Sequence, residues 1–216
     1  MIKKFYEETG MYIDWQQLNR LPEIDTLIDI GVGVYGTEDL YTRFKNAKLI
    51  LIDPIDEARE YAEKLSKKRE VDFFQYALGQ SDDAEKEMKI QKDKEYSSFL
   101  EISEINMQDD FVEKRKLKIK KLDTVISNKK EAYGKVGIKI DTEGFELDVI
   151  LGATETLKFT NFVIAEVRHN HESLKGVYKL QEFMNLMDKN NFSLSMIFTA
   201  KPFIADLCFQ PKDLKA

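Results

Sequence analysis

The sequence predicts an α/β protein built on a doubly wound, mostly parallel sheet of seven strands with an antiparallel C-terminal hairpin. Short apolar runs alternate with stretches of helical spacing up to residue 78, and the alternation returns after residue 135. Strands that alternate with helices favour a parallel sheet with right-handed crossovers. No repeat or low-complexity linker divides the 216 residues, so we expect a single domain over 1–216.

The first half of the chain is expected to supply three strands and two helices. Apolar runs at 25–30, 47–53 and 71–78 are typical of buried strands. A helix should begin at Thr37, a capping residue that is followed by two acids. A second helix should begin after Pro54, because proline fits the first turn and the stretch carries acids early and bases late.

Two segments have a less regular pattern. Residues 1–24 are expected to form an N-terminal extension, and residues 79–121 an irregular insertion or lid. Within the insertion, "EKEMKIQ" and "RKLKIKKL" alternate charged and apolar residues, as half-exposed strands do. The polar stretch between them is typical of a loop.

The second half returns to strands and helices. Strands are expected at 135–141 and 161–168, each followed by a stretch of helical spacing, "TEGFELDVILGATETL" and "LKGVYKLQEFMNLMDKNN". Two final apolar runs, "FSLSMIF" and "FIADLCFQ", are separated by a short turn and predict the antiparallel hairpin. In sheets of this kind ligands bind outside the carboxyl ends of the strands, so we look for functional residues there.

Composition narrows the class of protein. The net charge of −6 leaves no basic surface for nucleic acid. No segment approaches the roughly 20 apolar residues that span a bilayer, and the N-terminal stretch lacks the apolar core of a secretory signal, so a cytoplasmic location is expected. The single cysteine, Cys208, excludes an internal disulfide and a cysteine-based zinc site, and no metal is expected. An oligomer is compatible with the sequence.

A glycine-rich loop follows the first predicted strand. Gly31, Gly33 and Gly36 spell G-x-G-x-x-G, the pattern of a loop that offers backbone N–H groups to a pyrophosphate. Residues 25–42, however, hold four acids and neither lysine nor arginine. A carboxylate at Asp29 would repel a phosphate and attract an ammonium or sulfonium group.

Further ligand contacts are expected at the ends of the next two strands. Asp53 stands where a carboxylate can accept hydrogen bonds from a ribose diol, and Ala77 ends the third strand. Acids around glycines suit an adenosine with a cationic tail, which describes S-adenosylmethionine. Two alternatives stay open at this point: an NAD-dependent oxidoreductase and a non-catalytic nucleoside-binding module.

A longer motif narrows the choice. The segment "VGIKIDTEGFELDVILGATETL" (136–157) closely resembles the signature of the FkbM family of S-adenosylmethionine-dependent methyltransferases, K-I-D-x-E-G-x-E-x-x-x-L-x-G-A, with isoleucine at position 150. "LIDIGVG", "LIDP", "YALGQSDD", "YSSF" and "IKKLDTVI" resemble the family in the same order, over most of 26–168. The family's first loop is D-x-G-A-N-x-G, whereas this chain has Tyr35 before Gly36, so a different loop path is expected.

The resemblance implies a class I, Rossmann-like methyltransferase that methylates a hydroxyl oxygen of a sugar, a glycan precursor or another small metabolite. An alcohol needs a base to take its proton as it attacks. Asp141 and Glu143 are the leading candidates, although the first could serve only a turn and the second only a helix N-terminus. Glu166 and His169, after the following strand, could supply a second base.

The acceptor itself is expected to be a small molecule or a carbohydrate. Ser97 and Ser98 of the "YSSF" stretch are placed near the active site by the family resemblance. His171 lies beside the predicted mouth of the pocket. These three residues are the candidates for acceptor contacts.

Overall fold

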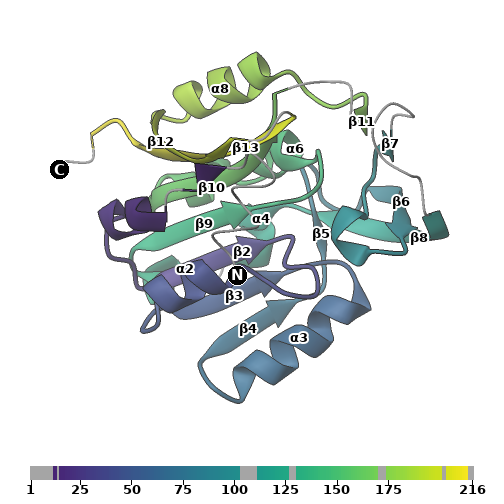
Figure 1. The fold of residues 1–216 in the computed structure, drawn as a ribbon, viewed down its shortest axis with the longest axis horizontal. Helices are drawn as coiled ribbons and strands as arrows, with labels where there is room; N and C mark the ends of the chain where they lie inside the picture. The colour runs from purple at the N-terminus through teal and green to yellow at the C-terminus, as the bar shows by residue number, and fades with distance from the viewer. Residues whose placement is uncertain are drawn as a thin grey trace.

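The computed structural model describes residues 12–13, 15–102, 111–126, 130–169, 174–200 and 203–213. Its main sheet has the strand order β1-β12-β13-β10-β9-β2-β3-β4, so the order reverses between β2 and β9 (Figure 1). Seven strands form the body of the sheet: β2 (Thr26–Ile30), β3 (Lys48–Ile52), β4 (Val71–Phe74), β9 (Val136–Ile140), β10 (Thr160–Arg168), β12 (Phe192–Ala200) and β13 (Ile204–Pro211).

The predicted fold class is confirmed, and the structure adds detail at one edge of the sheet. Strands β10, β9, β2, β3 and β4 are parallel to their neighbours in that series. Strand β13 runs antiparallel between β10 and β12. An eighth strand, β1 (Tyr12–Ile13), comes from the predicted N-terminal extension and pairs antiparallel with β12.

Helices cover both faces of the sheet, because the side chains of the buried strands alternate between two apolar clusters. In β2, Leu27 packs on the face covered by η1, α2 and α3, and Ile28 packs on the face covered by α4–α8. Figure 1 shows α8 beside β12 and α3 beside β4, at opposite ends of the sheet. The bounds are η1 (Trp15–Arg20), α2 (Glu38–Arg43), α3 (Asp56–Ser66), α4 (Leu122–Ile126), α5 (Lys130–Tyr133), α6 (Glu146–Leu151), α7 (Thr154–Leu157) and α8 (Leu180–Lys189).

One predicted strand and one predicted helix are each divided into two elements in the structure. The run 71–78 splits into β4 and β5 (Ala77–Leu78), which belong to different sheets; the Gln75 side chain between them bonds to Asp56 and to the carbonyl of Pro54. The helix expected after residue 142 is broken into α6 and α7 at Gly152, where a Cβ would lie 2.0 Å from a backbone oxygen of Gly79. Close backbone approach explains the second break.

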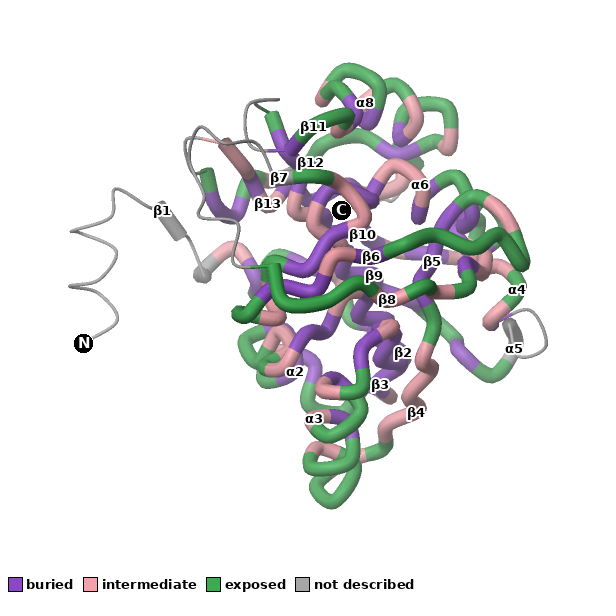
Figure 2. The backbone as a smooth tube through the Cα atoms, turned by 90° about the vertical axis from the view of Figure 1, so that its right-hand side faces the viewer, coloured by how far each residue is buried: buried purple, intermediate pink, exposed green. Residues whose placement is uncertain are grey.

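The predicted insertion contains regular β structure. Strands β6 (Glu85–Gln91) and β8 (Phe111–Lys120) form a long antiparallel hairpin, and β5 adds to β8 in parallel. The 3-10 turn η2 (Lys94–Tyr96) follows β6, and β7 (Glu101–Ile102) pairs with β11 (Leu174–Lys175). Figure 2 shows that β8 is mostly exposed, whereas β6 passes from exposed to buried along its length. The alternation of charged and apolar residues therefore correctly predicted two strands here. That the segment acts as a lid stays a prediction.

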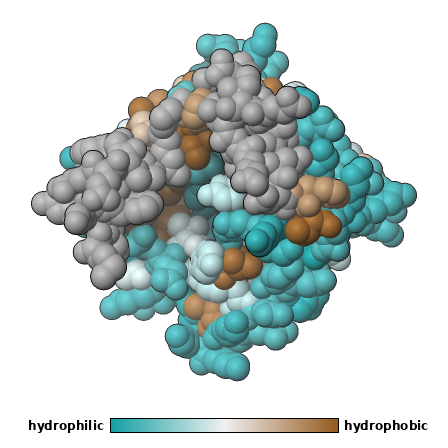
Figure 3. All heavy atoms as spheres, turned by 45° about the vertical axis from the view of Figure 1, so that its right-hand side comes forward, coloured by the Kyte–Doolittle hydropathy of each residue, from teal (hydrophilic) through white to brown (hydrophobic). Residues whose placement is uncertain are grey.

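The surface and the core agree with the composition. The face seen in Figure 3 is mostly hydrophilic, with smaller separate hydrophobic patches. Cys208 is fully buried in β13, as a small apolar side chain would be. Among the described residues, no helix has the length and hydropathy of a membrane-spanning segment.

Candidate active site

A cavity of about 360 Å³ lies at the carboxyl ends of the parallel strands, where the main sheet meets the insertion. Residues that end β2, β3, β9 and β10 line one side, and residues of the insertion line the other. Eight of the predicted site residues line this cavity: Gly31, Gly33, Asp53, Ala77, Ser97, Asp141, Glu143 and Glu166. The fold thus brings the cofactor candidates and the catalytic candidates to one space.

The glycines after β2 adopt backbone conformations that other residues rarely take. The angle φ is +80° at Gly31, +57° at Gly33 and +60° at Gly36. A Cβ at Gly31 would lie 1.7 Å from the carbonyl oxygen of Asp141, so only glycine lets the two loops approach this closely. The loop is a cradle of bare backbone beside the end of β9.

Asp53, at the end of β3, is buried and holds this loop in place. Its carboxylate accepts a hydrogen bond from the N–H of Gly33 and another from the N–H of Ile55, both at 2.9 Å. Burial raises the pKa of Asp53 to about 6, because the two hydrogen bonds offset the lost solvation only in part. The carboxylate lies in the wall of the cavity, where ribose hydroxyls could donate to it.

Asp29 lies beneath the loop and lines no cavity found among the described residues. It is 1% exposed and accepts a hydrogen bond from the hydroxyl of Tyr41 on α2. Its other oxygen, Oδ1, is buried without a hydrogen-bond partner within the described part of the chain. Burial raises its pKa. Its buried carboxylate lies close to the glycine loop, and the prediction that Asp29 takes part in cofactor binding stays a prediction.

Three carboxylates gather where β9 and β10 end, and we call them the acid triad: Asp141, Glu143 and Glu166. Their side-chain oxygens lie within 4.8 Å of one another. Arg168 forms an ion pair with Glu143. Lys139 reaches Asp141 at 3.2 Å and Asp206, on β13, at 3.3 Å. Two buried cations therefore form ion pairs with two members of the acid triad, Asp141 and Glu143.

This crowding changes the proton affinity of the acid triad. Burial, and next the charge of Asp141, raises the pKa of Glu143 to about 8, although Arg168 opposes the shift. The same two causes raise the pKa of Glu166 well above its usual value. Carboxylates at this spacing could hold a divalent cation, but acids with raised pKa values can instead share a proton near neutral pH. The prediction that no metal binds stays a prediction.

The loop that carries Glu143 is organised by Glu146 of α6. Its carboxylate, only 1% exposed, accepts hydrogen bonds from the N–H of Thr142 at 2.9 Å and the N–H of Gly144 at 3.0 Å. It also accepts a hydrogen bond from the hydroxyl of Tyr178 at 2.8 Å. These contacts fix a turn in which Glu143 takes a φ of +51°, rare for a residue with a side chain.

The insertion contacts both loops of the cavity. Glu95 of η2 accepts a hydrogen bond from the N–H of Val34 in the glycine loop at 2.7 Å. The hydroxyl of Ser98 donates to the carbonyl of Glu143 at 2.7 Å. Ser97 lines the cavity, and its hydroxyl accepts from the N–H of Gln91 at 3.2 Å. Ser98 therefore contacts the loop of Glu143, Ser97 lines the same cavity, and a role for either serine in acceptor binding stays a prediction.

Of the two predicted histidines, only His169 is among the described residues. His169 is exposed, lines no cavity found among the described residues, and uses its backbone N–H to bond Phe203. His171 lies outside the described residues. Sequence reasoning also gave no role to four residues that the structure brings to the site: Glu95, Lys139, Glu146 and Arg168. Two of these, Lys139 and Glu146, belong to the family signature, so the signature could have pointed to them.

A second cavity, of about 480 Å³, adjoins the first and shares Asp141 and Glu166 with it. It lies between the sheet and α2, and Lys139, Thr199 and Asp206 are among its lining residues. Two members of the acid triad thus line both cavities, and Glu143 lines the first.

A doubly wound sheet with a glycine loop and a strand-end acid at one cavity has the architecture of the class I methyltransferases. The sequence profile of the methyltransferase FkbM domain matches residues 29–194, well over half of the chain. The chain therefore belongs to the FkbM methyltransferase family, and S-adenosylmethionine is its cofactor. No curated protein matches the sequence significantly.

Solved structures of low sequence identity resemble the chain. A putative S-adenosylmethionine-dependent methyltransferase from Listeria monocytogenes is 10% identical, with 91% of this chain and 97% of that chain covered and a TM-score of 0.50. A SAM-dependent methyltransferase from Aquifex aeolicus is 12% identical, with 92% and 89% covered and a TM-score of 0.48. The ribosomal protein L11 methylase from Lactobacillus delbrueckii subsp. bulgaricus is 12% identical, with 91% and 75% covered and a TM-score of 0.49. At these identities the first comparison supports the fold alone.

Proposed function

We propose that this methyltransferase acts on a hydroxyl oxygen of a sugar or another small, polar metabolite. The observation that carries the proposal is the acid triad, Asp141, Glu143 and Glu166, which lines the first cavity and shares Asp141 and Glu166 with the second. An oxygen acceptor needs a proton acceptor at the place where it reacts, and the triad supplies one.

The residues present fit the cofactor. Gly31 and Gly33 leave room against the backbone, and Asp53 faces the cavity where a ribose diol could donate to it. The unpartnered Oδ1 of Asp29 adds buried negative charge under the loop, which suits a sulfonium. Apolar side chains suited to an adenine line the same cavity: Ile55, Leu78, Met88, Phe99 and Phe145. When bound, S-adenosylmethionine supplies an electrophilic methyl group.

The chain's own residues would then bind, orient and deprotonate the acceptor. Glu143 can accept the hydroxyl proton when it is ionised, because its raised pKa of about 8 still lies close to neutral pH, and such a role is worth about 10²–10⁴-fold in rate. Lys139 and Arg168 stabilise the negative charge of the triad. Holding the acceptor in line can contribute on the order of 7–11 kcal/mol.

The second cavity supports a polyhydroxylated acceptor. Its lining offers several hydrogen-bonding side chains, among them Thr199 and Asp206, and it opens onto the acid triad. Sugars present many hydroxyl groups, and such groups pair well with carboxylates and hydroxyls that are fixed in a concave site.

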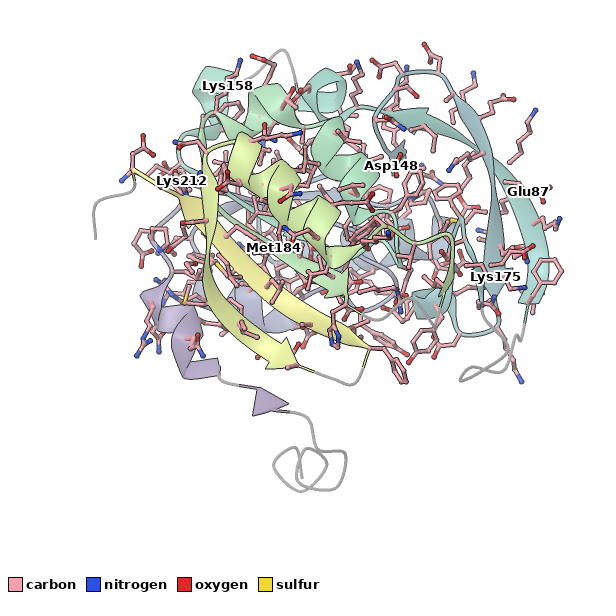
Figure 4. The ribbon with its side chains drawn as sticks, turned by 90° about the horizontal axis from the view of Figure 1, so that it is seen from above. Glu87, Asp148, Lys158, Lys175, Met184 and Lys212 are labelled. Carbon is pink, nitrogen blue, oxygen red and sulfur yellow. The ribbon has the colours of Figure 1, made fainter. Side chains whose placement is uncertain are left out.

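The test is a transfer assay with S-adenosylmethionine that carries a labelled methyl group. Monosaccharides, polyols and phenols would be offered as acceptors, with S-adenosylhomocysteine formation and product mass as readouts. We expect a methyl ether from a hydroxylated acceptor and a loss of at least 10²-fold in kcat in Glu143→Gln. The exposed Glu87, at the outer edge of the hairpin in Figure 4, gives the control Glu87→Gln. Methylation at nitrogen or carbon alone would overturn the oxygen assignment, and binding without transfer to any acceptor would favour a non-catalytic module.

A further inference from the structure

The glycine loop has the pattern of a phosphate site, yet its backbone donors are already in use. In a dinucleotide site such N–H groups point at the pyrophosphate. Here the N–H of Gly33 donates to Asp53 at 2.9 Å and the N–H of Val34 donates to Glu95 at 2.7 Å. Two carboxylates of the chain itself therefore stand where a phosphate would need to bind.

Glu95 is brought to this place by the insertion. It lies in η2, where its own N–H donates to the side chain of Asp93 at 3.3 Å, and the neighbouring Lys94 forms an ion pair with Glu57 of α3 at 3.8 Å. Its carboxylate fills the space beside the loop, because a Cβ at Gly33 would lie 2.3 Å from its Oε1. Glu95 is thus a wall of the cofactor cavity that comes from outside the doubly wound core.

The ionisable side chains that line the cavity are mostly acidic. Its lining holds five carboxylates (Asp53, Glu95, Asp141, Glu143 and Glu166) and two cationic side chains. Both cations are paired, Lys94 with Glu57 and Arg168 with Glu143. In low-dielectric surroundings, charges within a few ångströms of a ligand interact strongly. The site therefore favours a cation over an anion, and Glu95 contributes the charge nearest to Val34.

We propose that Glu95 selects the cofactor: its carboxylate attracts the sulfonium of S-adenosylmethionine and excludes phosphate-bearing nucleotides from the glycine loop. The proposal rests on the S-adenosylmethionine site described above and assigns to the insertion a part in recognition. It also gives a reason why a loop with the G-x-G-x-x-G pattern serves a ligand without phosphate. The carboxylate acts in two ways, by its charge and by occupying the Val34 N–H, and these can be separated by substitution.

Titration calorimetry on the full chain tests both actions. Glu95→Gln keeps the shape and an oxygen for the Val34 N–H but removes the charge, whereas Glu95→Ala also frees that N–H. Glu87→Gln, an exposed change on the same hairpin, is the matched control. The three ligands are S-adenosylmethionine, its neutral thioether product S-adenosylhomocysteine, and ADP.

We expect Glu95→Gln to weaken S-adenosylmethionine binding by at least about tenfold, because the variant loses the attraction between a carboxylate and the sulfonium. S-adenosylhomocysteine has no sulfonium, so its binding should weaken by much less. We expect Glu95→Ala to bind ADP at least about tenfold more tightly than the wild type does. Equal losses for the two adenosyl ligands, with no gain for ADP, would reduce Glu95 to a structural support and overturn the proposal. Wild-type protein that binds neither adenosyl ligand would instead refute the cofactor site itself, so the two failures are distinct.

Discussion

Glu146 gives the most demanding test of how the active site is held. Its buried carboxylate accepts four hydrogen bonds, from the N–H and the hydroxyl of Thr142, the N–H of Gly144 and the hydroxyl of Tyr178. Glu146→Ala would remove every one of these acceptors and leave the N–H of Gly144 and the hydroxyl of Tyr178 unpaired in buried surroundings. The loop from Asp141 to Gly144 would lose the contacts that fix its turn.

The size of the effect follows from those contacts. A hydrogen bond to a charged group contributes about 1.5–3 kcal/mol, and a buried donor left unpaired costs about 1–3 kcal/mol. Because the terms are not additive and removal of the charge relieves its desolvation, we expect a net loss of about 3–5 kcal/mol in the free energy of unfolding. In a chain of this size, such a loss lowers Tm by roughly 10 °C.

Denaturant titration and thermal melts measure this loss, and a second variant checks its cause. Glu146→Gln keeps an oxygen for the two backbone N–H groups, and its amide can donate to Tyr178, so we expect a loss of only about 1 kcal/mol. The exposed Glu155→Ala on α7 should change stability by less than about 0.5 kcal/mol. Equal destabilisation by the alanine and glutamine variants at Glu146 would refute the hydrogen-bond argument.

Three further outcomes are expected at the same site. Gly31→Ala should weaken S-adenosylhomocysteine binding by more than about tenfold in a titration, because its Cβ would meet the backbone of Asp141 at 1.7 Å and φ is +80°; wild-type affinity would contradict this. Affinity for S-adenosylmethionine should fall about tenfold per pH unit below pH 6, where Asp53 takes up a proton, and Asp53→Asn should bind weakly with no such slope. Glu143 has its pKa raised from 4.5 to about 8, so between these values the folded chain holds a proton that the unfolded chain has lost. Stability should therefore decline as pH rises across that window, and melts of Glu143→Gln should show a shallower decline; a parallel decline would contradict the assignment.

The core of the fold could be predicted because its signals are local. Buried parallel strands are continuous apolar runs, and β2, β3 and β9 read as such with boundaries close to those observed. Asp53 and Asp141 could be placed at the site because strand ends gather at one edge of a parallel sheet. The family signature then assigned the chemistry to the end of β9.

Other features of the candidate site could not be predicted, because they depend on contacts between segments that are distant in the sequence. Nothing near Glu95 in the sequence indicates that it would meet Val34, 61 positions away. The burial of Asp29 against Tyr41 was also hidden, since an acid before a glycine loop could equally face the ligand. Histidines attracted attention by their chemistry, but the exposed position of His169 depends on how the end of β10 pairs with β13.

The strand order also has a consequence for the way this chain acquires its structure. Asp29 in β2 pairs with Lys139 in β9, so the central pairing joins residues 110 positions apart (139 − 29). Bringing such distant segments together costs chain entropy before any sheet contact forms, and proteins rich in non-local pairings fold slowly. The β6–β8 hairpin lies inside that long loop and is local, so it can form early and shorten the effective distance to be closed. We therefore expect the catalytic edge to assemble late in folding, with the β6–β8 pair that borders the cavity helping to build the sheet.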